Sequence, residues 1–361
     1  MNADTDEAIL VVGPGWVGDM VMAQSLFKTL RQRPTKPVID VVAPVWGQAL
    51  LERMPEVRNA FTLGVGHGEL GLGRRWRLGQ ALKRQRYDQA IVLPRSAKSA
   101  LIPWLARIPQ RTGYRGEHRY GLLNDIRALD RQRTYRTVDR FVALGARHEE
   151  TLSDAKFGTG TNQIPSPELT STASQLAATV DALDLREGLG TGPVLTLCPG
   201  AEYGPAKRWP ATSFAALARH YLSLGWQVWL LGADKDAEIT QEIAGSAPGA
   251  RDLAGRTSLS QAIDLLSASD TVVTNDSGLM HIAAATTARV IALYGSSDPE
   301  YTPPLSDRAT VVYHALDCSP CFERHCPLGH LNCLRGITPD EVIGAIDGGP
   351  PRRAETSSRE P

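Results

Sequence analysis

The sequence lacks any apolar run of the roughly 18–20 residues that a helix needs to span a bilayer. Its opening segment, MNADTDEAIL, is acidic, whereas a secretory signal begins with basic residues. Cysteine is also scarce, because five residues among 361 are too few for an extracellular disulfide framework. These absences predict a cytoplasmic protein with no membrane anchor of its own.

Extreme composition is absent as well. Hydrophobic residues make up 42% of the chain and charged residues 22%, values that are typical of globular proteins and exclude a disordered or collagen-like chain. A chain of 361 residues exceeds what one hydrophobic core usually supports. We therefore expect two domains.

Net charge is zero, since 39 Lys and Arg balance 39 Asp and Glu, but the charge is unevenly distributed. The window from Arg74 to Arg147 contains 18 basic and five acidic residues, a net charge of +13 that leaves −13 on the rest. Such a window predicts an anionic partner. No nucleic-acid recognition motif accompanies it, so we do not expect nucleic acid.

Apolar runs alternate with helical patterns in both halves of the chain. Buried strands separated by helices predict parallel sheets covered on both faces, hence a doubly wound α/β fold. The expected strands are Ala8–Gly13, Val38–Ala43, Ala60–Leu63, Gln89–Leu93, Val194–Leu197, Gln227–Leu231, Thr271–Thr274 and Arg289–Tyr294. Helices are expected at Met20–Arg31, at Ser171–Leu183, after Pro210, and from Asp236 and Gly278.

A segment rich in Thr, Ser, Gly and Pro, from Thr151 to Gly192, separates the two series of strands. We predict an N-terminal domain at residues 1–170 and a C-terminal domain at 171–347. The tail, 348–361, has too few apolar residues to fold.

The turn after the first strand has the pattern G-x-G-x-x-G, from Gly13 to Gly18, which invites a dinucleotide-binding dehydrogenase interpretation. Two features argue against it. Asp40 lies inside the second strand rather than at its end, so the ribose partner is missing. Asp19 follows the last glycine, where its charge would repel a pyrophosphate. A carboxylate at a strand tip can instead accept a proton from a hydroxyl; the alternative is a simple helix cap.

Two polar segments follow strands of the second half. PGAEYGPAKRWP places Lys207 in a Gly- and Pro-shaped loop, and TNDSGLMH places Asp276, Ser277 and His281 around a helix start. Each residue has an ordinary alternative: Lys207 a surface lysine, Asp276 a cap, His281 a core histidine. Together, at two strand ends of one domain, they predict a site for a phosphorylated ligand.

GPGWVGDMVMAQ, PGAEYGPAKRWP and TNDSGLMHIAAA, in this order, resemble the lipopolysaccharide heptosyltransferase family, and the likeness extends from Ile9 to about Ile346. The resemblance implies a GT-B glycosyltransferase, with two Rossmann-like domains facing each other across a cleft. It further implies inverting transfer of L-glycero-D-manno-heptose from ADP-heptose to the first heptose of the lipopolysaccharide inner core.

The resemblance also implies roles for individual residues. Asp19 would be the general base, brought to the donor by domain closure, and Lys207 would bind the diphosphate. Asp276, Ser277, Gly278 and His281 would surround phosphate and sugar, and Asp234 would lie near the nucleoside. The residues that would hold the acidic inner-core acceptor are Arg74, Arg75, Arg77, Lys98 and Arg119.

No cofactor is expected, because Lys207 and a helix N-terminus can meet the charge on the leaving diphosphate. Four crowded cysteines, Cys318, Cys321, Cys326 and Cys333, leave a structural zinc site open, with no catalytic metal. Their spacing is compressed for zinc, so we favour reduced thiols.

The expected partners are ADP-heptose and the anionic inner-core glycolipid. Reaching a glycolipid without an anchor calls for peripheral contact with the cytoplasmic face of the inner membrane, for which Trp76 and Trp104 are candidates. Two alternatives remain open: a GT-B transferase for another nucleotide sugar, and a non-catalytic sugar-nucleotide-binding protein.

Overall fold

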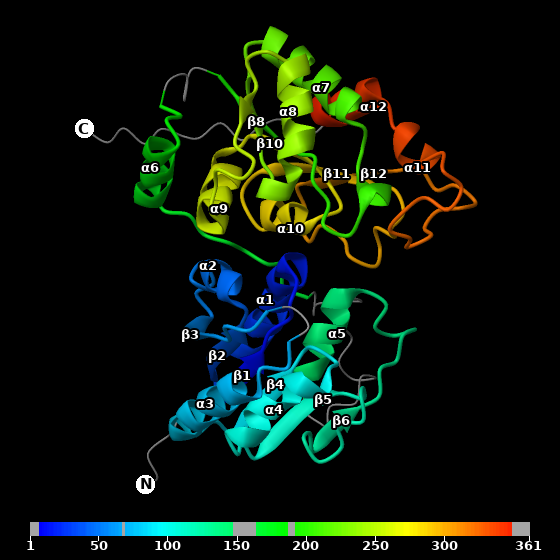
Figure 1. The fold of residues 1–361 in the computed structure, drawn as a ribbon. Coiled ribbons are helices and arrows are strands. Elements are labelled where there is room, and N and C mark those ends of the chain that lie inside the picture. The colour runs from blue at the N-terminus through cyan, green and yellow to red at the C-terminus, as the bar shows by residue number, and fades with distance from the viewer. Residues whose placement is uncertain (1–6, 67–68, 147–163, 187–191, 349–361) are drawn as a thin grey trace.

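The computed structural model describes residues 7–66, 69–146, 164–186 and 192–348. Two α/β domains are stacked on each other, the first running from blue to green and the second from green to red (Figure 1). The predicted tail lies outside the described residues apart from Gly348. Across the described ranges, no helix combines the length and apolarity needed to cross a bilayer.

The first domain is built on six parallel strands in the order β3-β2-β1-β4-β5-β6. This is the doubly wound order of a Rossmann fold, with a topological switch point between β1 and β4. The strands are β1 (Ala8–Val12), β2 (Val38–Ala43), β3 (Val57–Thr62), β4 (Gln89–Val92), β5 (Gln110–Tyr114) and β6 (Asp125–Arg127).

The second domain repeats this architecture in the order β12-β11-β10-β7-β8-β9, again all parallel. Its switch point lies between β7 and β10, the strands that precede the two polar segments. The strands are β7 (Val194–Cys198), β8 (Gln227–Leu230), β9 (Arg251–Asp252), β10 (Thr271–Asn275), β11 (Arg289–Tyr294) and β12 (Ala309–Tyr313). The fold class expected from the sequence is confirmed.

Helices cover both sheets. In the first domain α1 packs on α5 and α3 packs on α4, while α6 packs on α9 of the second domain. The α-helices are α1 (Val17–Arg31), α2 (Gln48–Leu51), α3 (Leu72–Leu82), α4 (Ala97–Leu105), α5 (Thr137–Leu144), α6 (Ala173–Ala182), α7 (Ala211–Ser223), α8 (Ala237–Ser246), α9 (Leu259–Ala268), α10 (Gly278–Ala284), α11 (Asn332–Arg335) and α12 (Pro339–Asp347). Short 3-10 turns are η1 (Val45–Gly47), η2 (Lys83–Gln85), η3 (Pro205–Lys207) and η4 (Asp234–Asp236).

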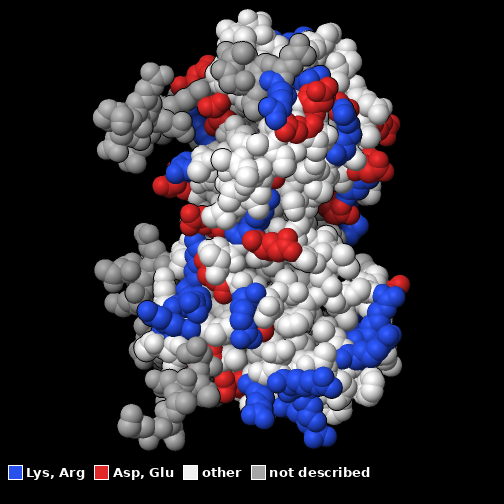
Figure 2. Space-filling model, turned by 90° about the vertical axis from the view of Figure 1, so that its left-hand side faces the viewer, with Lys and Arg blue, Asp and Glu red and all other residues white. Residues whose placement is uncertain are grey.

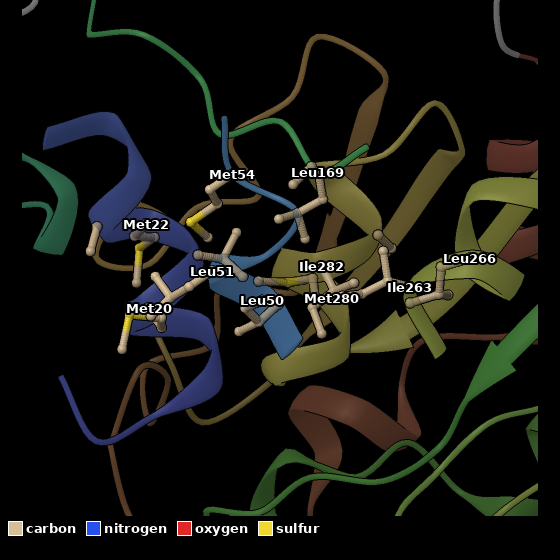
Figure 3. Packing of buried hydrophobic residues seen from close by; sticks show 14 of the residues in the cluster. Met20, Met22, Leu50, Leu51, Met54, Leu169, Ile263, Leu266, Met280 and Ile282 are labelled. Atoms are coloured by element: carbon tan, nitrogen blue, oxygen red, sulfur yellow. The ribbon is translucent and has the colours of Figure 1, made fainter. Parts of the chain in front are cut away.

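One cluster of buried apolar side chains runs through both domains. Met20 of α1 and Leu50 of α2 come from the first domain, Leu169 from the connecting segment, and Ile263 and Met280 from the second domain (Figure 3). A shared core resists separation of the domains, because opening it would expose apolar surface to water. The interface therefore holds α1 and α10 against each other.

A buried ion pair adds a polar link between the domains. Arg53, after α2, lies 2.9 Å from Asp264 of α9, and both side chains are less than a tenth exposed. Arg53 also donates to the carbonyl of Thr170, while Asp264 accepts from the hydroxyls of Ser171 and Thr179. The desolvated charges are thus paired and hydrogen-bonded, as buried charges must be.

Candidate active site

Asp19 lies in the first turn of α1, directly after the glycine-rich turn that follows β1. The helix is capped at Trp16 without a side-chain hydrogen bond. Within the part of the chain that the structure describes, the Asp19 carboxylate has no hydrogen-bond or ion-pair partner. This geometry does not support the capping alternative and leaves the carboxylate free for chemistry.

Two glycines allow the start of α1 to touch the start of α10 across the domain interface. A Cβ atom built on Gly18 would lie 2.4 Å from Cδ2 of His281. One built on Gly278 would lie 2.9 Å from Cβ of Val17. A larger residue at either position would force the neighbouring atoms to shift. Asp19, the base candidate, therefore already lies beside the candidate donor-site segment in this structure.

The carboxylate of Asp276, at the end of β10, lies close enough to influence Asp19. Asp276 itself pairs with Lys207 and accepts a hydrogen bond of 2.6 Å from the hydroxyl of Ser297. Desolvation, and secondarily the negative charge of Asp276, raise the pKa of Asp19 to about 6. The group is therefore ionised at neutral pH, yet it is a stronger base than an ordinary aspartate.

His281, in the second turn of α10, is buried against Gly18. Burial lowers its pKa to about 4, against a smaller opposing effect from the charge of Asp276. The imidazole is consequently neutral at physiological pH. A neutral ring adds no positive charge to the site, so Lys207 is the cation that faces Asp276.

The donor-side residues lie at the carboxyl edge of the second sheet, as the sequence predicted. Lys207 ends η3 in the loop after β7, with its Nζ atom 5.2 Å from the centre of the Tyr203 ring. Ser277 caps α10 by accepting from the amide of Met280 at 3.4 Å. Asp276, Ser277 and His281 thus lie together at the end of β10 and the start of α10. Lys207 approaches them from the loop after β7, the neighbouring strand across the switch point.

Asp234 lies further along the same edge, in the turn after β8. The side chain is exposed, and a Cβ atom built on Gly255 would lie 3.1 Å from its Cα atom. It is not part of the cluster around Asp276, and contact with the nucleoside stays a prediction.

Two of the five acceptor candidates are buried. The Arg75 guanidinium donates to the carbonyls of Leu70 and Lys98, at 2.6 and 3.0 Å. Arg119 donates twice to the carbonyl of Tyr114, and burial lowers its pKa to about 10. Both guanidinium groups hold loops of the first domain together here, so an additional role in acceptor binding stays a prediction.

The other three candidates are accessible. Arg74 and Arg77 are exposed on α3, and Lys98, at the start of α4, is partly exposed with its Nζ atom 3.4 Å from the carbonyl of Glu69. Figure 2 shows groups of basic side chains over the lower, first domain, where acidic ones are sparse, whereas the two kinds mix on the upper domain. The charge asymmetry of the sequence is therefore also an asymmetry between domains.

The four clustered cysteines occupy the loop between β12 and α11 and the start of α11. All four are free thiols, and Cys333 is buried. Counting only residues with described positions, no set of three or more His, Cys, Asp or Glu side chains is arranged to hold a metal ion. Independence from metals stays a prediction.

Three residues of this region were not anticipated from the sequence. Ser297 follows β11 and could have been found, because neighbouring strands of a parallel sheet end at the same edge. Tyr203 lies inside the quoted loop but carries no charge to single it out. Arg324 comes from the cysteine-rich loop, and no sequence signal connects that loop with the donor segment.

Comparisons with known proteins agree in what they find. The family model of glycosyltransferase family 9 (heptosyltransferase) matches residues 75–332. The chain is 44% identical over 353 residues to lipopolysaccharide heptosyltransferase 2 of Escherichia coli (strain K12), covering 94% of this chain and 97% of that relative. It is 46% identical over 312 residues to lipooligosaccharide heptosyltransferase 2 of Haemophilus influenzae, covering 84% of this chain and 88% of that relative.

Solved structures give the same result. The structure of E. coli ADP-heptose LPS heptosyltransferase II superposes with a TM-score of 0.83 at 42% identity, covering 94% of this chain and 98% of that one. An E. coli heptosyltransferase solved with ADP has a TM-score of 0.69 at 18% identity, covering 94% and 99%, and shares the fold.

Proposed function

Because the chain belongs to glycosyltransferase family 9, the heptosyltransferases, we propose that it transfers heptose from ADP-heptose to the first heptose of the lipopolysaccharide inner core. The observation that carries this proposal is the 44% identity to a heptosyltransferase 2 over 94% of the chain. Identity at this level spans both domains, so it includes the donor and the acceptor halves. A dehydrogenase is excluded by the family.

Asp19 is the proposed general base. An acceptor hydroxyl is a poor nucleophile at neutral pH, and an ionised carboxylate within hydrogen-bond reach removes its proton as the new C–O bond forms. Among the described residues the Asp19 carboxylate has no hydrogen-bond or ion-pair partner, and this and its pKa of about 6 support the role. Attack from the face opposite the leaving ADP inverts the anomeric carbon.

Lys207 is the proposed contact of the leaving diphosphate. Negative charge grows on the diphosphate as the glycosidic bond breaks, and a preorganised cation lowers that barrier. Asp276 pairs with the lysine before the donor arrives, and the Ser297 hydroxyl, which donates to Asp276, holds that carboxylate in place. No step in this scheme requires a metal.

The basic face of the first domain is proposed to meet the acceptor and the membrane that carries it. Leu72, Trp76 and Trp104 are exposed on α3 and α4, at 58%, 56% and 46%, beside Arg74 and Arg77. Apolar rings among basic groups are suited to an anionic bilayer surface. We propose peripheral association with the cytoplasmic face of the inner membrane.

The proposed reaction is tested with purified protein, heptosyl-Kdo2-lipid A and a panel of nucleotide sugars. We expect release of ADP from ADP-heptose, and an acceptor product heavier by one heptose in the mass spectrum. Faster release of UDP from a UDP-sugar would show that the donor is a UDP-sugar rather than ADP-heptose. Binding of ADP-heptose without any product would favour a non-catalytic binding protein.

Membrane association is tested by co-sedimentation with vesicles of phosphatidylglycerol and phosphatidylethanolamine. The double variant Trp76→Ser with Trp104→Ser should sediment less, while Leu224→Ser, at an equally exposed apolar site of the second domain, should sediment like the wild type. Equal sedimentation of all three proteins would contradict the proposed surface.

A further inference from the structure

The loop between β12 and α11 folds back over the donor segment. The amide of Ala206 donates to the carbonyl of Arg324 at 3.1 Å. The Tyr203 hydroxyl donates to the carbonyl of Phe322 at 2.6 Å, and the Phe322 amide donates to the carbonyl of Ser296 at 2.7 Å. These bonds fix the loop at the carboxyl edge of the second sheet, directly beside the residues around Asp276.

A glycine permits this close approach. A Cβ atom built on Gly204 would lie 2.5 Å from the carbonyl oxygen of Arg324, far inside the normal contact distance. The donor segment therefore has a residue without a side chain where the loop crosses it. The crossing is part of how the segment that carries Lys207 is shaped.

The crossing brings a cation from outside the donor segment to the same tyrosine ring that Lys207 lies beside, while the segment's own Arg208 is paired with Asp236. The Arg324 guanidinium carbon lies 5.1 Å from the centre of the Tyr203 ring, and Nζ of Lys207 lies 5.2 Å from the same centre. Arg324 is exposed, and its guanidinium forms no ion pair with any side chain that the structure describes. Lys207, in contrast, is already paired with Asp276.

The negative charge of the site makes the cation of Arg324 significant. The carboxylates of Asp19 and Asp276 lie near Lys207, so the positive charge of the lysine is already neutralised before a ligand binds. A bound diphosphate adds about two further negative charges, and like charges at short range repel strongly in a partly desolvated site. The site therefore needs further positive charge. An arginine can supply it, because its planar guanidinium binds two phosphate oxygens at once.

We propose that Arg324 is a second diphosphate-binding residue of the donor site, held in place by Tyr203. The proposal rests on the proposed use of a nucleoside diphosphate sugar and adds a residue from outside the donor segment. Tyr203 acts as a positioning residue, because both cations lie close to its ring and its hydroxyl donates to the carbonyl of Phe322 in the loop that carries Arg324.

The proposal is tested by calorimetric binding of ADP and of adenosine to the wild type, Arg324→Gln and Arg324→Lys. We expect Arg324→Gln to weaken ADP binding about tenfold or more and to leave adenosine binding unchanged. Arg324→Lys should bind ADP with intermediate affinity, since it keeps the charge and loses the fork. In turnover assays, Arg324→Gln should raise the KM for the donor and leave the KM for the acceptor unchanged.

A matched control is Arg219→Gln on α7, whose exposed guanidinium donates to the carbonyl of Ser246 at 2.9 Å. It should bind both ligands like the wild type. Wild-type ADP affinity in Arg324→Gln would overturn the proposal, and so would equal losses of ADP and adenosine affinity, which would indicate only a disturbed loop. If the wild type prefers UDP and Arg324→Gln weakens UDP, the proposed donor fails while the role of Arg324 stands.

Discussion

Asp19 combines features that ordinary surface aspartates lack. It is in the first turn of a helix, it has no partner within the described ranges, and it faces Asp276 from the other domain. Desolvation and that neighbouring charge raise its pKa to about 6, which strengthens the base without neutralising it at physiological pH. The same environment that makes it useful also makes it costly to ionise.

The pH dependence of kcat/KM follows from this pKa. Below about pH 6 Asp19 is protonated and cannot accept a proton, so activity should fall tenfold for each pH unit. Asp276→Asn removes a negative charge, lowers the pKa of Asp19 and should move the acidic limb of the pH profile to lower pH. Initial rates of ADP release between about pH 5 and pH 8.5 measure it. A limb near pH 4, the ordinary range for aspartate, would contradict the assigned environment.

Stability should respond to the same group in the opposite sense. The folded pKa of about 6 exceeds the ordinary value of 3.8, so the contribution of Asp19 to stability is present below 3.8 and is lost as pH rises through 6. Asp19→Asn should therefore be more stable than the wild type at pH 8, by on the order of 1–3 kcal/mol of unfolding free energy, and should unfold at a higher temperature. Near pH 4 the difference should vanish in the same thermal scans. A less stable Asn variant at pH 8 would contradict a raised pKa of Asp19 in the folded protein.

The sequence was informative about residues at strand ends and uninformative about burial. Asp19, Lys207 and Asp276, which the structure brings together, could be selected as candidates because parallel strands present their following residues at one edge. Arg75 and Arg119 were grouped with exposed arginines, since the carbonyls that surround them come from loops whose path only the fold determines.

Among the elements, the pair α1 and α10 carries the most consequence. Their first turns meet through Gly18 and Gly278, with His281 against the backbone of α1. Helix starts this close fix the distance between the proposed base on one domain and the proposed donor site on the other. A displacement of about 1 Å at such a place can cost as much as a hundredfold in rate.

Gly18→Ala should therefore impair catalysis. The new Cβ would lie 2.4 Å from Cδ2 of His281, so the buried imidazole or the two helices must shift, and we expect kcat to fall about tenfold or more. Steady-state rates at saturating substrates measure it. Gly15→Ala is the control, since no heavy atom lies within 4 Å of its added Cβ. Equal kcat values for the two variants would show that the contact does not position Asp19.

Apart from the edge strand β3, the strands that the sequence predicted lie inside the two sheets, and most of those it missed lie at the sheet edges. Four strands, β5, β6, β9 and β12, were not anticipated. Three of them are short or polar, with QRTGY in β5, DIR in β6 and RD in β9, and so lack a run of apolar residues. The fourth, β12, has the apolar sequence ATVVY and was overlooked. Expected strand limits were otherwise close, except that β3 begins at Val57 rather than Ala60.

At the scale of the whole molecule, the two domains are joined by an apolar core and the ion pair of Arg53 and Asp264. The domain interface is thus built like a protein interior. The sequence predicted two domains but gave no sign of this, since the partners are far apart along the chain. The charge asymmetry, in contrast, was visible in the sequence and recurs on the surface of the first domain (Figure 2).

Removing one partner of the buried pair should destabilise the protein strongly. Arg53→Met or Asp264→Asn leaves an uncompensated group in the interface, and we expect a loss of about 3–5 kcal/mol of unfolding free energy. Denaturant unfolding measures it, with the exposed pair of Arg133 and Asp130 as control, where Arg133→Met should cost less than about 1 kcal/mol. Similar losses at both pairs would mean that the buried pair does not hold the domains together.

The most direct test of the account is the turnover of Asp19→Asn with ADP-heptose and heptosyl-Kdo2-lipid A, measured beside its affinity for ADP. Asparagine preserves the shape of the side chain and cannot accept the proton. We predict that kcat falls by about 10²–10⁴-fold while ADP binds at least as tightly as to the wild type, because the substitution removes a negative charge beside Asp276. A variant that turns over at the wild-type rate would contradict the assignment of Asp19 as the base.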